Sequence, residues 1–157
     1  MSPQPLIDLS EIDFDQVAMN IDEVRTYNQQ RYEMEQLDGI VAIDLEKGYA
    51  VAHRDVRDDA FWVRGHIPGR PILPGVLMIE SAAQLSSLYY KVSTKDERFL
   101  GFGGVDNVKF RGAVVPGQRL IVVIRVVEMR SRKAIFDSQG IVDGKIVFEA
   151  RITGMPL

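Results

Sequence analysis

The clearest pattern in the chain is a series of three β-prone segments near its C-terminus. β-Branched and other apolar residues dominate residues 118–129, 133–143 and 145–155, a composition typical of strands. A charged turn over residues 130–133 separates the first two segments. Asp143-Gly144, a dipeptide that favours a tight type I′ hairpin, separates the last two. Since strands joined by short turns pair with their neighbours, we predict an antiparallel meander.

The N-terminal half contains weaker patterns of the same kind. Residues 37–63 hold β-rich runs on both sides of Glu46-Lys47-Gly48, which predicts strands joined by a hairpin turn. Residues 21–36 start with acidic residues and consist mostly of good helix formers, which predicts a short helix. Residues 1–20 have only scattered apolar positions. We interpret them as a loose N-terminal arm that precedes a single domain over residues 21–157.

The segment Val76–Tyr90 predicts one long helix. It contains no Gly or Pro, and its apolar residues lie on nearly all sides, so the helix should be buried on most of its faces. One buried helix among many strands indicates an α+β fold, in which a curved antiparallel sheet wraps around a central helix. The run LIVVIRVV over residues 120–127 lacks clean alternation, which indicates that the outer face of the sheet is covered too. We expect a second subunit to provide that cover.

Composition narrows the functional classes. The 157 residues are 46% hydrophobic and 26% charged, the size and composition of one globular domain. A net charge of −3 argues against binding of nucleic acid. Without cysteine, and with only two histidines, the chain offers no common metal site, and we expect neither metal nor cofactor. No apolar run reaches the ~18–20 residues of a membrane span, and the acidic N-terminus lacks the basic region of a signal peptide, so we expect a cytoplasmic protein.

The stretch GHIPGRPILPGVLMIESAAQ, residues 65–84, carries the candidate chemistry. Three prolines and three glycines fall within its first eleven residues. Prolines fix the backbone and glycines allow sharp bends, so this loop can hold His66 in a fixed place. Gly75 stands at the predicted helix start, where backbone N–H groups lack helical partners and attract negative charge. The sequence therefore places a histidine base close in the chain to a possible oxyanion site.

Two residues of the helix complete this set. Glu80 lies about a turn and a half into an apolar segment, and such surroundings favour the protonated form of a carboxyl group. Gln84, four residues later on the same face, can orient Glu80 by a hydrogen bond. A structural reading of each residue competes, since loop histidines and lone helical glutamates are often only hydrogen-bonded or edge residues. We assign His53, which lies in a strand pattern, a structural role.

The motif resembles the signature of the 3-hydroxyacyl-[acyl-carrier-protein] dehydratases, in the general branch with a catalytic glutamate. The downstream segment GVDNVKFRGAVVPGQRL resembles the next signature of that family, and DVRDDAFWVRGH has the family's layout. The resemblance extends from Leu37 to the C-terminus. It implies a hot-dog fold, a catalytic pair of His66 and Glu80, and a Gly75 N–H that polarises the thioester carbonyl.

The same resemblance implies a reaction and partners. The reaction is dehydration of (3R)-3-hydroxyacyl-acyl-carrier-protein to the trans-2-enoyl product in fatty-acid biosynthesis. The partners are acyl carrier protein bearing a 3-hydroxyacyl phosphopantetheine and further copies of the chain, as a homodimer or a trimer of dimers. In the family the histidine and the glutamate meet across the dimer interface.

Two departures and two alternatives accompany the resemblance. Gln30-Arg31-Tyr32-Glu33 stands where the family has Pro-His-Arg-Tyr-Pro, and Pro116-Gly117-Gln118 replaces Pro-Gly-Asp. The first alternative function is a hot-dog acyl thioesterase, which needs a carboxylate that activates water but not this spacing of histidine and glutamate. The second is a non-catalytic acyl-binding protein, which has no reason to keep both residues.

Overall fold

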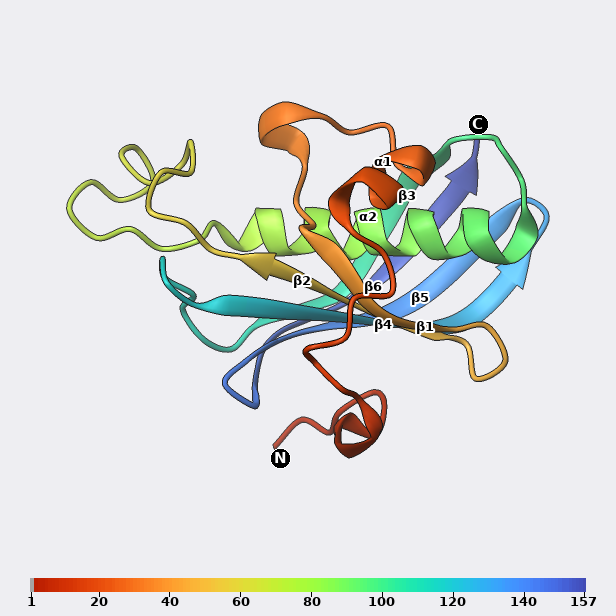
Figure 1. Cartoon of the computed structure of the whole chain (residues 1–157), viewed down its shortest axis with the longest axis horizontal. Coiled ribbons are helices and arrows are strands. Elements are labelled where there is room, and N and C mark those ends of the chain that lie inside the picture. Colours follow the sequence, from red (N-terminus) through yellow and green to blue (C-terminus); the bar gives the residue numbers. More distant parts are fainter. Residues whose placement is uncertain (1) are drawn as a thin grey trace.

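A computed structural model describes residues 2–157 of the chain, which form a curved antiparallel sheet around one long helix (Figure 1). The helices are α1 (Ile21–Tyr27) and α2 (Gly75–Thr94), with short 3₁₀ turns at Leu9–Glu11 and Tyr32–Met34. The strands are β1 (Gly39–Asp44), β2 (Tyr49–Asp55), β3 (Leu100–Phe110), β4 (Arg119–Arg130), β5 (Lys133–Val142) and β6 (Lys145–Pro156).

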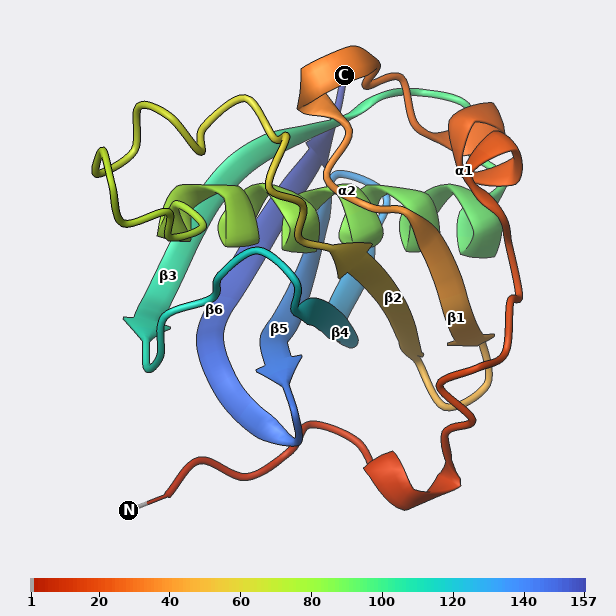
Figure 2. The same ribbon diagram turned by 60° about the vertical axis from the view of Figure 1, so that its left-hand side comes forward.

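The strands form a single sheet in the order β1-β2-β4-β5-β6-β3. All neighbouring pairs are antiparallel, and β4, β5 and β6 pair in sequence order, which confirms the predicted meander. The sheet curls around α2 so that the helix lies along its concave face (Figure 2). The predicted fold class is therefore confirmed, with β1 and β3 as the two edge strands.

Helix α2 forms the centre of the core. Its Leu85 and Leu88 are completely buried, and Tyr89 makes an edge-to-face contact with Phe136 of β5 at 5.9 Å between ring centroids. The hydroxyl of Ser86 donates to the carbonyl of Ala82, so this buried polar group is satisfied within the helix. The helix runs one turn beyond the predicted Tyr90 and ends at Thr94, where the backbone turns into the left-handed region.

The predicted helix over residues 21–36 is correct only in its first half. Asn20 and Glu23 form a capping box that starts α1, but Asn28 is extended and α1 ends at Tyr27. The Asn28 side chain donates to the carbonyl of Gln84 in α2 at 3.1 Å, and Gln84 in turn accepts from the backbone of Gln36. Hydrogen bonds to α2 thus hold residues 28–36 in a path that is not α-helical and that local propensity does not favour.

The expectation of a loose N-terminal arm is wrong, and part of the expected cover of the outer sheet face comes from this chain itself. Apolar arm residues pack on the outer face of the sheet, against a fully buried cluster. The arm contributes Leu6, Ile7, Leu9, Ile12 and Phe14, and the sheet contributes Val41, Val51, Val123 and Ile141. The arm backbone is also fixed, since the N–H of Leu6 donates to Gln139 at 2.9 Å. This chain's own arm therefore covers part of the face for which we expected a second subunit.

Two further differences concern strands. Strand β3 is rich in glycine and largely exposed, so the hydrophobic pattern did not predict it. Residues 56–63, predicted as strand, form turns instead, and only Val56 and Trp62 among them are buried.

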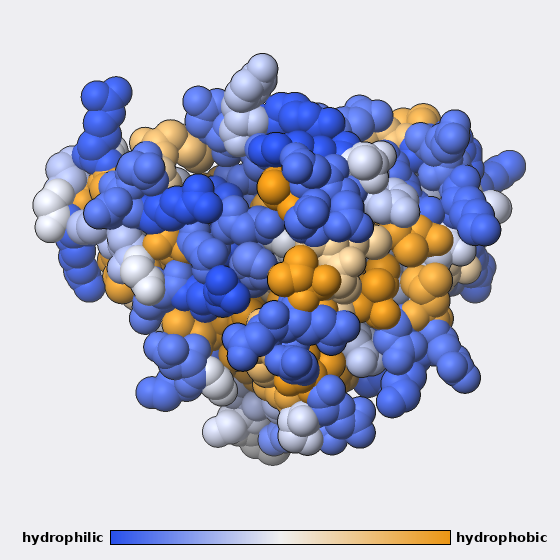
Figure 3. Space-filling view, viewed as in Figure 1, coloured by the Kyte–Doolittle hydropathy of each residue, from blue (hydrophilic) through white to orange (hydrophobic). Residues whose placement is uncertain are grey.

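The surface is mainly hydrophilic, with apolar patches where the arm crosses the β1 side of the sheet (Figure 3). Within residues 2–157 no helix is both long enough and apolar enough to cross a membrane.

Candidate active site

His66 lies in the loop of residues 56–74, which projects beyond the start of α2 (Figure 1). Several backbone hydrogen bonds stabilise this loop. The His66 N–H donates to Trp62 at 2.8 Å, and Trp62 is buried with 6% of its surface exposed. The Leu73 N–H donates to the carbonyl of Val114 at 2.8 Å, which ties the far end of the loop to the segment after β3. The predicted loop is thus present, and the buried Trp62 and backbone hydrogen bonds hold its conformation.

The imidazole of His66 is fixed in one tautomer by its contact with the backbone. Its Nδ1 lies 2.7 Å from the carbonyl oxygen of Ile72. Because a carbonyl oxygen only accepts hydrogen bonds, Nδ1 carries the proton of the neutral ring. The lone pair is then on Nε2, the atom that can take a proton from a substrate. The side chain is only partly buried, so this nitrogen is within reach of a ligand.

The backbone is strained directly after the histidine. Ile67 has φ of +60°, in the left-handed region. For a β-branched residue this conformation is a true outlier and costs on the order of 1–3 kcal/mol. Such strain persists only where the surroundings enforce it, and it gathers at functional sites. The observation supports a functional role for this turn.

Gly75 begins α2 without a side-chain cap. The residue before it is Pro74, which has no side-chain acceptor for the first N–H groups of the helix. Within residues 2–157 the N–H of Gly75 donates to no other group. It therefore keeps its hydrogen-bonding capacity for a ligand, at the positive end of a helix of 20 residues.

Glu80 is held by the glutamine that we expected to orient it. Nε2 of Gln84 donates to Oε1 of Glu80 at 2.8 Å and to the carbonyl of Met34 at 2.6 Å. Its Oε1 accepts from the N–H of Gln36 at 3.0 Å. Gln84 is only 3% exposed, and three hydrogen bonds leave it one orientation. The position of the carboxyl group thus depends on the segment over residues 34–36.

A small pocket of about 110 Å³ lies beside Glu80 between α2, β3 and β6. Its walls include Gln30, Ala83 and Phe102. His66 does not line it, and within residues 2–157 no hydrogen bond or ion pair joins His66 to Glu80. A larger cavity of about 810 Å³, between the arm and the sheet, contains none of the predicted site residues. One chain therefore presents the two candidate catalytic groups in separate places.

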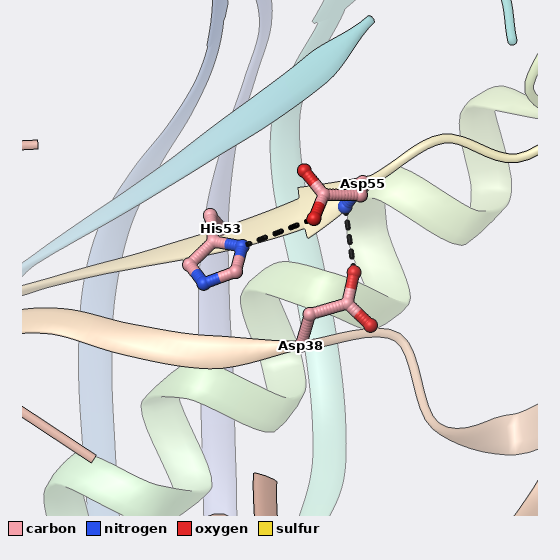
Figure 4. Close-up of side chains that lie close together, drawn as sticks. All are labelled: Asp38, His53 and Asp55. Atoms are coloured by element: carbon pink, nitrogen blue, oxygen red, sulfur yellow. Dashed lines mark hydrogen bonds and ion pairs between the residues drawn. The ribbon is translucent and has the colours of Figure 1, made fainter. Parts of the chain in front are cut away.

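The second histidine lies in a cluster of charges on β2 (Figure 4). Nδ1 of His53 lies 3.9 Å from Asp55, and the N–H of Asp55 donates to Asp38 at 2.6 Å. Each carboxylate already has a cation, because Arg54 binds Asp38 at 3.2 Å and Arg119 binds Asp55 at 2.7 Å. The hydrogen bond from Arg119 lowers the pKa of Asp55. Since both carboxylates are compensated by arginine, we assign the cluster a structural role rather than that of a metal site.

Burial and a neighbouring cation disfavour the protonated form of His53. Burial lowers the pKa of His53, and the positive charge of Arg119 lowers it further. Asp55 and Asp38 act in the opposite direction but do not reverse the shift. The Nδ1 atom is buried and has no hydrogen-bond partner among the described residues.

A long helix wrapped by a curled antiparallel sheet, with a histidine loop leading into the helix, defines a hot-dog fold. A family model described as a FabA-like domain matches residues 28–151, which is most of the chain. The protein belongs to this FabA-like family of dehydratases.

Individual relatives agree with this family. A 3-hydroxyacyl-[acyl-carrier-protein] dehydratase FabZ from Clostridium beijerinckii is 32% identical over 139 residues, covering 85% of this chain and 96% of the relative. The dehydratase heterocomplex ApeI:P from Xenorhabdus doucetiae has a similar structure, with a TM-score of 0.71, 16% identity and coverage of 85% and 90%. A hypothetical thioesterase from Streptococcus pneumoniae TIGR4, solved with coenzyme A, has a TM-score of 0.60, 14% identity and coverage of 75% and 84%. At such low identity, the two structures establish the fold alone.

Proposed function

We propose that this chain converts (3R)-3-hydroxyacyl-acyl-carrier-protein to trans-2-enoyl-acyl-carrier-protein in fatty-acid biosynthesis. One observation carries the proposal: Nδ1 of His66 binds the carbonyl of Ile72 at 2.7 Å, which leaves Nε2 as a free base. Membership of a family whose relatives bear the dehydratase name supplies the reaction class. No metal or organic cofactor takes part in this mechanism.

Dehydration breaks a C–H bond at C2 and a C–O bond at C3 of the acyl chain. Nε2 of His66 takes the C2 proton, and the thioester oxygen gains negative charge that the Gly75 N–H stabilises. The electron pair at C2 then forms the double bond while the hydroxyl group leaves C3 as water with a proton from Glu80. A proton moves back from the imidazolium to the carboxylate to reset the site. Acid–base groups contribute roughly 10²–10⁴ each in rate, and one oxyanion donor about 10²–10³.

We infer that two chains form the working unit. Among residues 2–157, strand β3 pairs only with β6, so its other edge has no partner strand there. An exposed edge with apolar side chains invites another strand, and Phe102 and Val105 of β3 are 47% and 37% exposed. The pocket beside Glu80 is lined by residues of this same strand. A partner chain on this edge would bring a second histidine loop toward Glu80, as the resemblance to the family implies.

The acyl carrier protein is an acidic partner, and the His66 loop carries cations for it. Arg64 and Arg70 are exposed on that loop, and local patches of charge steer association even when net charge is negative. Arg111, which follows β3, donates to Glu149 at 2.7 Å, so its charge is already compensated. We therefore assign the docking of the carrier to the loop rather than to Arg111.

The test is an assay with purified protein and a 3-hydroxyacyl-acyl-carrier-protein. We expect absorbance of a conjugated enoyl thioester to appear and the mass of the acyl chain to fall by one water. A parallel reaction with a saturated acyl thioester measures release of free thiol, which a thioesterase would produce. Thiol release without enoyl formation would establish the alternative function. Tight binding of acyl-carrier-protein without turnover of either substrate would establish an acyl-binding protein.

A further inference from the structure

The second sequence signature, VDNVKF at residues 105–110, has no part in the mechanism above, although it ends next to the oxyanion site. Phe110 is the last residue of β3, and its ring lies against Gly75. A methyl group placed on Gly75 would come within 2.6 Å of Cε1 and 2.9 Å of Cζ of that ring. No side chain larger than hydrogen fits there unless the ring or the helix start moves.

The ring of Phe110 has a rigid support behind it. It stacks on Phe148 of β6, with 5.9 Å between centroids and 27° between planes. Phe148 is 1% exposed and belongs to the main core, whereas Phe110 is 53% exposed. A large aromatic that is half exposed gives up much of the benefit of burial. The core thus supports Phe148, Phe148 supports Phe110, and Phe110 contacts the first residue of α2.

A β-bulge turns Phe110 toward the helix. Val105 pairs with Ile152 and Phe110 pairs with Phe148, two positions of β6 whose side chains point into the core. Positions 105 and 110 are an odd number of residues apart, so a regular strand would point them to opposite faces. Between Asp106 and Lys109 the strand gains one residue over its partner, which restores both side chains to the inner face.

Asn107 provides the unusual backbone within this bulge. Its φ is +53°, a conformation that asparagine adopts more readily than most residues. The bulge therefore has a local cause in the sequence and a consequence for Phe110. Bulges of this kind re-aim side chains next to active sites.

We propose that Phe110 is a positioning residue: its ring, backed by Phe148 and aimed by the bulge at Asn107, fixes the start of α2 and so the Gly75 N–H. The inference rests on the proposed function for its catalytic consequence, but the contact itself does not. A shift of about 1 Å in a group that stabilises charge can reduce the rate up to about 10²-fold, so a fixed helix start has direct value for turnover.

The test is a double-mutant cycle with Gly75→Ala, Phe110→Ala and the combined variant. We expect Gly75→Ala to lower kcat by about 10² or more because the methyl group collides with the ring. Phe110→Ala alone should lower kcat by about tenfold or more, with a smaller change in KM. In the combined variant the methyl group has room, so kcat should exceed that of Gly75→Ala by about tenfold. Losses that multiply instead would overturn the proposal.

Two controls separate positioning from general damage. Phe110→Leu keeps part of the apolar contact and should fall between the parent and Phe110→Ala. Val127→Ala removes an exposed apolar side chain from β4, far from the helix start, and should leave kcat at the parent value. Size-exclusion chromatography of each variant shows whether the oligomer is preserved, since β3 is also the proposed edge for a partner.

Two readouts decide the contact without any assay of activity. Gly75→Ala should lower Tm in the parent and not in the Phe110→Ala background. Phe110→Ala should also speed amide hydrogen exchange at residues 78–79 more than at the C-terminal end of α2. If the parent shows no dehydration, the proposed function fails, but these readouts still test whether Phe110 fixes the start of α2. Equal effects of Gly75→Ala on Tm in both backgrounds would refute that role of Phe110.

Discussion

The two histidines of this chain lie in contrasting surroundings. His53 stands on β2 beside two aspartates, and arginines already bind both carboxylates. His66 stands in a loop with no carboxylate bonded to it among the described residues, and its Nδ1 contacts only a backbone carbonyl. A search for histidine beside carboxylates would therefore select His53 and not His66, the residue that we propose as the base.

The contrast shows what makes an imidazole available as a base. The carbonyl of Ile72 fixes the tautomer of His66 and leaves Nε2 unused and partly accessible. His53 is 16% exposed in its side chain, and burial disfavours its charged form. A group that cannot readily become an imidazolium is a poor proton acceptor. The predictions below test this contrast, from the largest expected effect to the smallest.

The largest effect should come from His66→Ala. We expect kcat for dehydration to fall by at least ~10², the lower end for a general base. The lost hydrogen bond to Ile72 costs about 1 kcal/mol, so Tm should change by only about 2–4 °C for a domain of this size. His53→Gln is the matched control and should leave kcat close to that of the parent. Comparable loss of kcat in both variants would remove the distinction between the two sites.

Glu80→Gln tests the acid that acts with His66. The amide keeps the size of the side chain but cannot deliver a proton, so dehydration should fall by roughly 10² or more. Exchange of the C2 proton with solvent deuterium, measured by mass spectrometry of recovered substrate, should continue because His66 is intact. Dehydration near the parent rate would instead assign the acid to the imidazolium of His66 and leave Glu80 only a positioning role.

Mixing the two inactive proteins His66→Ala and Glu80→Ala tests whether two chains share a site. Random exchange makes half of the dimers mixed, and each mixed dimer has one intact site of two, so roughly a quarter of the sites should work. The measurement is dehydration rate after mild denaturation and refolding together. No recovery, despite mixed dimers visible by mass spectrometry, would mean that each chain holds a complete site. An active species of 17.7 kDa would have the same meaning.

The smallest effect concerns His53 and acid. Its pKa is lowered in the folded chain by burial and by Arg119, so the unfolded chain binds a proton first as the pH falls through about 6.5. The stability from the neutral ring is present above that pH and is lost on acidification. Between about pH 7 and pH 5, Tm of His53→Gln should therefore fall less steeply than Tm of the parent. Parallel slopes would show that His53 does not contribute to acid sensitivity.

Where the determinants of an element are local, sequence and structure agree. The positions of proline and glycine correctly predicted the start of α2, and the absence of both residues after it predicted the helix length to within a turn. Asp143-Gly144 correctly predicted the turn between β5 and β6. The contact between Gln84 and Glu80 follows from a spacing of four residues on a helix and is present at 2.8 Å. Such features depend on residues that are near one another in the chain.

Where contacts with distant residues oppose local conformational preference, the prediction from the sequence was wrong. Residues 28–36 have helical composition, but hydrogen bonds to Gln84 and Ser81 of α2 hold their end in a path that contains only a short 3₁₀ turn. Strand β3 has too many glycines for a strand pattern, yet it pairs along β6. The arm has too few apolar residues to fold alone, but the outer face of the sheet gives them a surface to cover.

The sequence by itself determined the identity of the chemical groups: His66 in a stiff loop, Gly75 at a helix start, and Glu80 with Gln84 on one helical face. Only the tertiary structure decided which imidazole nitrogen is free, which ring lies on Gly75, and that His66 and Glu80 do not meet within one chain. The physical reason is the distance along the chain between the residues that determine each feature. Rotamers, caps and turns respond to neighbours a few residues away, whereas the partner of a buried polar group or an aromatic face is set by packing between elements far apart in the chain.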